Sequence, residues 1–487
     1  ISQANLSNPY SEGGAINIEN YNATFCDCIF DNNTVFSYYD EIYVSHAKGG
    51  SVYLYAYNTS VINCYFTNNF AHGAYENCCA AGFFNSELII INNCSFISNR
   101  VDGFHAESSA FELENTISAI IDNCTFINNT STGSAINGGL IMFYIYKRWC
   151  EYSIQSCVFS DNLAKRNGEV FYNIRGGLIM VRNSQKTNIS ISFANCTFNN
   201  NAVMFSPSSD DFDCFGCIIY FELYHYVKDN TFPHKIAINY CNFCNNSLHA
   251  KFLGTDKSLI NGSCLYIQKS DATIDSCIFV NNSLYYDSLL AENTISGFVI
   301  FFLSYELHLI STIFENNDAY FENSSSAYGY GGVISVEQYT SYLGNDNCTC
   351  FIADCRFLNN CLNSNNNIEG GDLYSYMANI TVQNSEFITN PKNILSSIYY
   401  IAYVNNFLNI HDCTFKINVF NNSVQKSLIL LSVRNSSDLI NSFLNNQIFI
   451  TNSDDNNYYH IFNGTLNKIQ KWTFENNCLT PYNSSLF

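Results

Sequence analysis

Clustered carboxylates are the first residues to consider, because they carry much metal-binding and hydrolytic chemistry. The densest acidic spots are Asp210-Asp211-x-Asp213 and Asp454-Asp455, and the nine His are scattered. Polysaccharide lyases and hydrolases need paired carboxylates, or carboxylates with basic or calcium-binding partners, on one face. Asp210, Asp211 and Asp213 could bind Ca²⁺ in a loop, although a solvated acidic loop explains them as well. We therefore expect no catalytic residue and no metal or other cofactor.

Paired cysteines offer a second kind of chemistry. Cys214 and Cys217 form one C-x-x-C pair and Cys241 and Cys244 form another, a spacing that is found in zinc sites. Cys241, however, also belongs to a repeated position described below, so we expect a disulfide among the other three rather than a zinc site. The disulfide candidates outside that repeated position include Cys214, Cys217, Cys244, Cys348, Cys350 and Cys361.

A repeated motif, F-x-x-N, runs through the whole chain. It occurs fourteen times, at intervals of 28 to 45 residues that average about 34. Ten copies carry Cys two residues before the Phe, so the full form is C-x-F-x-x-N, as in residues 94–99. Fourteen copies in phase are typical of a repeat protein. The motifs begin at Phe30, Phe66, Phe96, Phe126, Phe159, Phe198, Phe243, Phe279, Phe314, Phe357, Phe387, Phe415, Phe443 and Phe474.

A second repeated element, Gly-Gly followed by apolar residues, precedes several motifs, as at Gly13-Gly14 and Gly49-Gly50. Each repeat also holds two or three short runs rich in Val, Ile, Tyr and Phe, separated by Asn, Gly and Ser, which predict strands and turns. Propeller blades have a similar length, but a propeller typically holds only four to eight of them. The repeat therefore predicts an all-β, right-handed parallel β-helix of about fourteen coils.

Stacked coils would place equivalent residues above one another, which gives the motif a physical meaning. Residues i and i+2 of a strand share a face, so the Cys and Phe would point inward and fill a narrow core. The Asn would lie at a corner, because it tolerates left-handed backbone and its amide can bond the next coil. The predicted columns of Asn, Phe and Cys include Phe30, Asn33, Cys64, Phe66, Asn69, Cys94, Phe96, Asn99, Cys124, Phe126 and Asn129.

The spacing of coils also predicts the chemical state of the column Cys. Parallel stacked side chains hold their Cβ atoms about 4.8 Å apart, which is longer than a disulfide prefers. We therefore expect most of these Cys to be buried thiols.

A solenoid grows by adding coils, so the repeat predicts one elongated domain over residues 1–487, although the length alone would suggest about three domains. The longest intervals between motifs predict protruding loops near residues 205–235 and 318–350. Residues 395–487 keep the motif but lose Gly-Gly and most Cys, which predicts a less regular terminal portion.

Composition indicates the compartment and excludes some partners. The chain has 21 Lys+Arg against 41 Asp+Glu, a net charge of −20, which argues against nucleic-acid binding. It has no apolar run long enough to span a bilayer. Twenty N-x-S/T sequons and 22 Cys favour the secretory route and a secreted or cell-surface protein. An AT-rich genome is the alternative explanation for 72 Asn and abundant Ile, Tyr and Phe.

Because side chains along a strand point alternately inward and outward, the position of a sequon in its strand predicts whether its Asn faces solvent. Asn93, Asn123 and Asn195 directly precede a motif Cys and should face solvent. Asn129 is both a sequon and a motif Asn, so we expect a glycan on Asn128 and none on Asn129. The expected glycosylation sites are Asn22, Asn32, Asn58, Asn93, Asn123, Asn128, Asn188, Asn195, Asn245, Asn261, Asn281, Asn323, Asn379, Asn435 and Asn463.

The pairing of segments such as Gly13-Gly14-Ala15-Ile16 with F-x-x-N resembles the repeat of the chlamydial polymorphic outer membrane proteins. The resemblance covers nearly the whole chain through F-x-x-N and six places through Gly-Gly. It implies a right-handed parallel β-helix displayed on a cell surface, with a role in adhesion. We expect the chain to depart from that family in having no membrane β-barrel ending, because its dense sequons predict a eukaryotic secretory protein instead.

Together these patterns predict a glycosylated extracellular β-helix with a structural or adhesive role at the cell surface. Expected partners are other copies of the chain, other surface or matrix proteins, a host or neighbouring-cell surface, and N-glycans. Exposed aromatic pairs, Tyr38-Tyr39 and Tyr285-Tyr286, mark either a binding face or an outer wall under glycan. One alternative is a filament subunit, because an open coil end is a sheet edge that needs a cover. The other is a polysaccharide lyase or hydrolase of the pectate-lyase-like β-helix class.

Overall fold

The computed structural model is all-β: among the residues that it describes, every regular element is a strand. It describes residues 5–481 apart from 8–9, 38–45, 74–75, 148, 167–173, 184–187, 206–211, 217, 224–233, 253–257, 289–292, 323–326, 331, 339–347, 364–367, 370, 390–395, 403–405, 420–425, 434–439, 453–458, 466–470 and 476. The strands form three long parallel sheets, which we call A, B and C; sheet A has 14 strands, sheet B has 20, and sheet C curls on itself.

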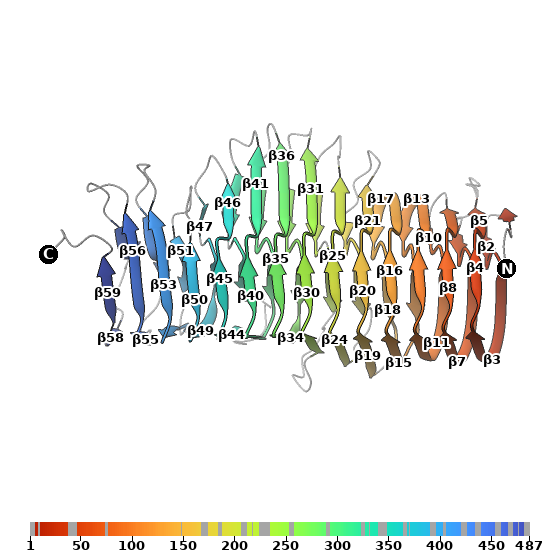
Figure 1. The fold of residues 1–487 in the computed structure, drawn as a ribbon, viewed down its shortest axis with the longest axis horizontal. Helices are drawn as coiled ribbons and strands as arrows, with labels where there is room; N and C mark the ends of the chain where they lie inside the picture. Colours follow the sequence, from red (N-terminus) through yellow and green to blue (C-terminus); the bar gives the residue numbers. More distant parts are fainter. Residues whose placement is uncertain are drawn as a thin grey trace.

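Each repeat contributes strands to all three sheets in a fixed order. In the third repeat, β11 (Gly82–Asn92) lies in sheet C, β12 (Ser95–Ile97) in sheet A and β13 (Arg100–Glu107) in sheet B, before β14 (Phe111–Glu114) returns to sheet C. Each strand pairs in parallel with its equivalent in the next repeat, so Phe96 lies opposite Phe126. Figure 1 shows the result, an elongated stack of strands with the two termini at opposite ends.

Sheet A carries the motif Phe from Phe30 to Phe415, mostly on short strands that lie between two corners. Its strands are β4 (Ile29–Asp31), β8 (Tyr65–Thr67), β12, β16 (Thr125–Ile127), β20 (Val158–Ser160), β25 (Thr197–Asn199), β30 (Asn242–Cys244), β35 (Ile278–Val280), β40 (Ile313–Glu315), β45 (Arg356–Leu358), β50 (Glu386–Thr389), β53 (Thr414–Val419), β56 (Gln447–Asn452) and β59 (Cys478–Pro481).

The corners on both sides of each sheet A strand use left-handed backbone. In the fourth repeat these residues are Asn123 (φ 52°) and Asn128 (φ 54°), which directly precede the motif Cys and the motif Asn. The motif pattern predicts the left-handed conformation for the motif Asn itself, and that prediction is wrong. The exposed residue before it makes the turn, and it is Asn, Ser or Asp in ten successive repeats from Asn32 to Asn359.

The motif Asn instead turns its amide into the stack. The Oδ1 of Asn317 accepts hydrogen bonds from the backbone N–H of Asn282 (3.1 Å) and from its Nδ2 (2.9 Å). The Nδ2 of Asn317 donates to the Phe279 carbonyl and to the Oδ1 of Asn360, both at 2.9 Å. Each amide therefore satisfies a backbone donor and a carbonyl of neighbouring repeats. The buried Asn joined in this way are Asn33, Asn69, Asn99, Asn129, Asn162, Asn201, Asn246, Asn282, Asn317 and Asn360.

The motif Phe form a second stack beside the Asn. From Phe30 to Phe415 successive rings have centroids 4.5 to 5.0 Å apart, and their planes are nearly parallel, as for Phe357 and Phe387 (4.7 Å, 2°). That separation equals the distance between paired strands, so the backbone register fixes the ring stacking. All twelve rings are buried, and they lie in one continuous apolar core.

The last two motifs are out of register with the others. Phe443 lies in sheet C opposite Ile410, while Ile448 takes the place opposite Phe415. The buried amide of Asn446 accepts a hydrogen bond from the backbone N–H of Cys413 (2.9 Å), so it fills the corner that Cys fills in earlier repeats. The sequence count of fourteen in-phase copies is therefore wrong for the two C-terminal motifs, because an Asn side chain replaces the Cys at that corner.

The Gly-Gly element makes the corner between sheets B and C. The first Gly has a left-handed backbone, as at Gly49 (φ 65°). A Cβ on Gly49 would lie 2.2 Å from the Val52 carbonyl oxygen, so only glycine fits there.

The two residue ranges predicted as protruding loops include strands of sheet C. Within residues 205–235, β28 (Ile219–Leu223) lies in sheet C between two equivalent strands. Within residues 318–350, β43 (Ile334–Glu337) does the same. Each long repeat keeps the strands of its neighbours, so its extra residues lie between strands. Sheet B ends at β47 (Ile368–Glu369), and the described strands after it belong to sheets A and C.

Candidate binding groove

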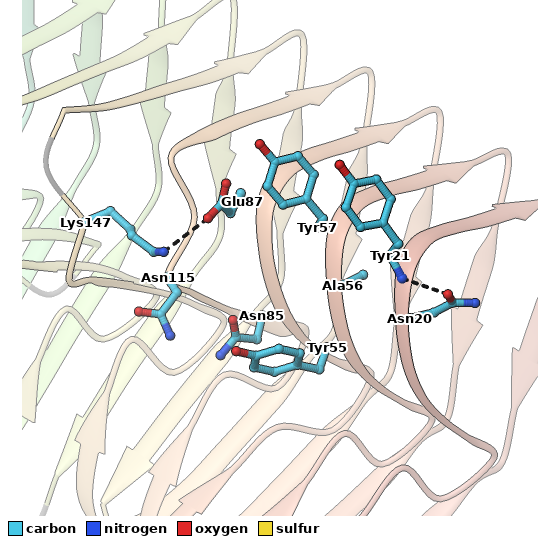
Figure 2. Close-up of a pocket in the computed structure, with 9 residues that line it drawn as sticks. All are labelled: Asn20, Tyr21, Tyr55, Ala56, Tyr57, Asn85, Glu87, Asn115 and Lys147. Carbon is cyan, nitrogen blue, oxygen red and sulfur yellow. Dashed lines mark hydrogen bonds and ion pairs between the residues drawn. The ribbon is translucent and has the colours of Figure 1, made fainter.

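A break in strand alternation creates a bend in sheet C. In β7 (Val52–Ile62), Val52, Leu54 and Ala56 are buried, but the next buried residue is Thr59, so two consecutive residues face outward. The same step occurs in β11, and in later repeats the two halves are separate strands, such as β14 and β15 (Ser118–Asp122). Figure 2 shows the chain bending at this point in successive repeats.

The outer side of the bend forms a groove with a volume of about 620 Å³. Tyr21 and Tyr57 lie side by side along it, with ring centroids 5.0 Å apart and planes within 6° of parallel. They are 66% and 42% exposed, and Tyr55 is 56% exposed. Figure 2 shows Tyr55 and Asn85 on the opposite side of the groove. The full lining is Asn20, Tyr21, Tyr55, Ala56, Tyr57, Asn85, Glu87, Asn115 and Lys147.

The polar part of the groove is electrically balanced. Glu87 is the one carboxylate among the lining residues, and its Oε1 lies 3.2 Å from the Nζ of Lys147. The charge of Glu87, and then its hydrogen bond, raises the pKa of the Tyr57 hydroxyl, which keeps that hydroxyl protonated. The groove thus offers aromatic rings, side-chain amides and one ion pair.

A second groove of about 430 Å³ continues the first along the stack. The two linings are neighbours: the backbone N–H of Ile117, in the second groove, donates to the carbonyl of Glu87, in the first (2.8 Å). Trp149 is the exposed large hydrophobic side chain of this lining, at 64%. Its lining is Ile117, Ser118, Trp149, Cys150, Glu151, Asn188, Ile189, Ser190 and Lys235. We call the two grooves together the bend surface.

Charged residues also gather in the corner between sheets B and C, where Lys48 and Glu114 are half-buried and Glu112 is buried. The Nζ of Lys48 lies 4.2 Å from the centre of the Phe83 ring and 3.9 Å from a carboxylate oxygen of Glu114. The Cys79 thiol donates to Glu112 (3.1 Å), and both are buried. This cluster packs the corner between the two sheets.

The predicted glycosylation sites fall into several groups. Eight Asn are exposed and two, Asn58 and Asn188, are half-buried. Asn261 and Asn379 are only 4% and 7% exposed, and this burial disfavours a glycan at either amide. Asn323 and Asn435 lie outside the described residues, as does the side chain of Asn463. The exposed ones are Asn22, Asn32, Asn93, Asn123, Asn128, Asn195, Asn245 and Asn281.

The structure forms no disulfide among the disulfide candidates that it describes. Cys348 and Cys350 are thiols, and both point into the core from one strand, β44 (Cys348–Ala353), too far apart to bond each other. Cys244 and Cys361, both half-buried, and the buried Cys214 are also in the thiol form. Cys217 lies outside the described residues.

No group of three or more potential metal ligands occurs in the part of the chain that the structure describes. The candidate calcium ligands Asp210 and Asp211 lie outside it, as does the side chain of Asp213. Asp454 and Asp455 are outside it too.

The predicted aromatic pairs are not the aromatic surface that the structure shows. Tyr286 is buried in the core and Tyr285 is half-buried, because consecutive strand residues alternate, and Tyr38-Tyr39 lie outside the described residues. The F-x-x-N motif does not itself indicate the bend surface. One regularity in the sequence does point to it, since Tyr21 and Tyr57 both lie nine residues before a motif Phe.

Comparison with protein-family models, with curated proteins and with solved structures finds no match to this chain. Over the described residues, the structure has no helix of the length and apolarity needed to cross a bilayer.

Proposed function

We propose that the chain is a right-handed parallel β-helix of about fourteen coils with a structural or adhesive role at the cell surface. Support for the fold comes from the parallel sheets, from the order in which one repeat visits them, and from the repeated Asn and Phe contacts. The dense sequons support an extracellular location, since eight of the expected acceptors are exposed.

The single observation that carries adhesion is the exposed bend surface. Tyr and Trp are enriched in binding interfaces, because they offer a large rigid contact area with a polar tip. Here Tyr21, Tyr57 and Trp149 are exposed on a stack whose interior is held by regular hydrogen bonds. A rigid scaffold with exposed aromatic rings binds without having to order its own side chains first, so binding loses little entropy.

Attachment of coated beads to cells tests this role. Beads carrying the whole chain, made in a secretory host, should attach to cells of the source organism or its neighbours, and soluble chain should compete. Antibody labelling of intact cells should find the chain at the surface. Surface labelling without attachment or competition would leave a structural role and remove adhesion.

The two alternatives give different results with the same preparation. A filament subunit would form elongated polymers that lengthen with concentration under the electron microscope. A polysaccharide lyase or hydrolase would release new reducing ends from a polymer, whereas an adhesive protein releases none.

A further inference from the structure

We propose that the bend surface binds a neutral oligosaccharide chain that lies along the axis of the stack. This proposal rests on the adhesive role proposed above and names the ligand of the same surface. Tyr21 and Tyr57 stack on each other, so apolar C–H groups of the sugar would pack against their exposed ring edges and against the exposed Tyr55. The sugar hydroxyls would bond the side-chain amides and the ion pair that line the same groove.

The mixture of groups in the groove fits a sugar better than a purely apolar ligand. A pyranose ring has apolar faces and a rim of hydroxyls, each of which can donate and accept a hydrogen bond. The groove supplies matching groups, with the amides of Asn20, Asn85 and Asn115 and the Glu87–Lys147 pair beside the Tyr rings. A volume of about 620 Å³ is within the usual range of roughly 300–1,000 Å³ for small-molecule sites.

Charge selects a neutral chain over an acidic one. The first groove has one Glu and one Lys in an ion pair, and the second has Glu151 and Lys235, so each carries balanced charge. The whole protein has a net charge of −20. A sulfated or uronic acid polymer would meet this repulsive field without a cationic groove to offset it.

The backbone of the bend disfavours a peptide as the occupant. Peptides often bind by adding a strand to an open sheet edge. Here β7 is paired with β3 (Ile16–Cys26) on one side and with β11 on the other, before and after the bend, so it offers no open sheet edge to which a peptide could add a strand.

The two grooves are lined by neighbouring repeats of sheet C, which favours an extended polymer. Sheet C strands lie side by side from β3 to β24 (Ile189–Ala194), across six successive repeats. Five steps between paired strands span roughly 24 Å. The exposed Trp149 offers the ligand a further aromatic contact in the second groove.

Binding of defined neutral hexasaccharides tests the proposal. The probes are hexamers of β-1,4-glucose, β-1,4-mannose, β-1,4-xylose and β-1,4-N-acetylglucosamine, with a sulfated and a uronic acid hexamer for comparison, measured by calorimetry on the whole chain. At least one neutral hexamer should bind. The double variant Tyr21→Ala/Tyr57→Ala should weaken that binding about tenfold or more, and Tyr57→Phe should retain most of it because the ring remains.

Tyr65→Ala is the matched control. Tyr65 is 51% exposed but lies on β8 in sheet A, away from the bend, so its loss should leave the affinity within about twofold. The proposal is overturned if no neutral hexamer binds, if the acidic hexamers bind more tightly, or if the double variant binds like the control. Cell attachment of coated beads without any hexamer binding would overturn the sugar ligand and keep the adhesive role.

Discussion

Replacing one buried motif Asn should destabilise the protein far more than replacing its exposed neighbour. Asn317 is completely buried and takes part in four side-chain hydrogen bonds with its neighbours in the stack. Asn317→Ala removes all four. The adjacent Asn316 is exposed and left-handed (φ 51°), so Asn316→Gly keeps its backbone conformation and serves as the control.

The size of the effect follows from the groups that lose their partners. Without the Asn317 amide, the backbone N–H of Asn282 and one N–H of its side chain have no acceptor in a buried site. Each unsatisfied buried donor costs about 1–3 kcal/mol, so the free energy of unfolding should fall by about 2–6 kcal/mol. Asn316→Gly should change it by no more than about 1 kcal/mol.

Two measurements check this together. Urea denaturation gives the change in the free energy of unfolding, and hydrogen exchange at the Asn282 amide reports the local loss, which matters because stacked repeats can unfold in parts. The amide of Asn282 should exchange much faster in Asn317→Ala than in Asn316→Gly. Equal stability and equal exchange in the two variants would refute the role given to the buried amides.

Three further outcomes follow from burial. Burial raises the pKa of the Cys355 thiol to about 12, so this thiol should resist alkylation in the native protein and react in denaturant; mass spectrometry that finds it in a disulfide would contradict the packing. Burial also raises the pKa of Glu337 from 4.5 to about 7, so the folded state holds a proton that the unfolded state has lost. Stability should therefore fall as the pH rises from about 4.5 to about 7, and Glu337→Gln should remove that slope in thermal unfolding. Glycopeptides from a secretory host should carry a glycan on the exposed Asn128 and none on the buried Asn129; the reverse would disprove the register.

The repeat motif contains most of the information about packing. Because Cys and Phe recur two residues apart, the spacing alone indicates that residues such as Cys94 and Phe96 point inward, and the structure buries both. The motif predicts the wrong position where another side chain takes the place of the motif Cys at its corner. Asn446 fills a Cys corner, so the apparent motif at Phe443 belongs to another sheet.

The bend surface could not be predicted from the F-x-x-N motif, because it depends on a local break in the alternation of inward and outward side chains. Nothing in F-x-x-N indicates that Tyr57 and its successor both face outward. Sequons have a related limit, since N-x-S/T specifies an acceptor without specifying its burial. Asn261 satisfies the pattern and is nevertheless 4% exposed.

Adhesion through the bend surface is tested most directly by comparing beads coated with three forms of the chain. Beads with the unaltered protein and beads with Tyr65→Ala should attach to cells equally, because Tyr65 lies in sheet A. Beads with Tyr21→Ala/Tyr57→Ala should lose most of their attachment while the protein keeps its stability. Full attachment by the double variant would contradict the assignment of adhesion to this surface.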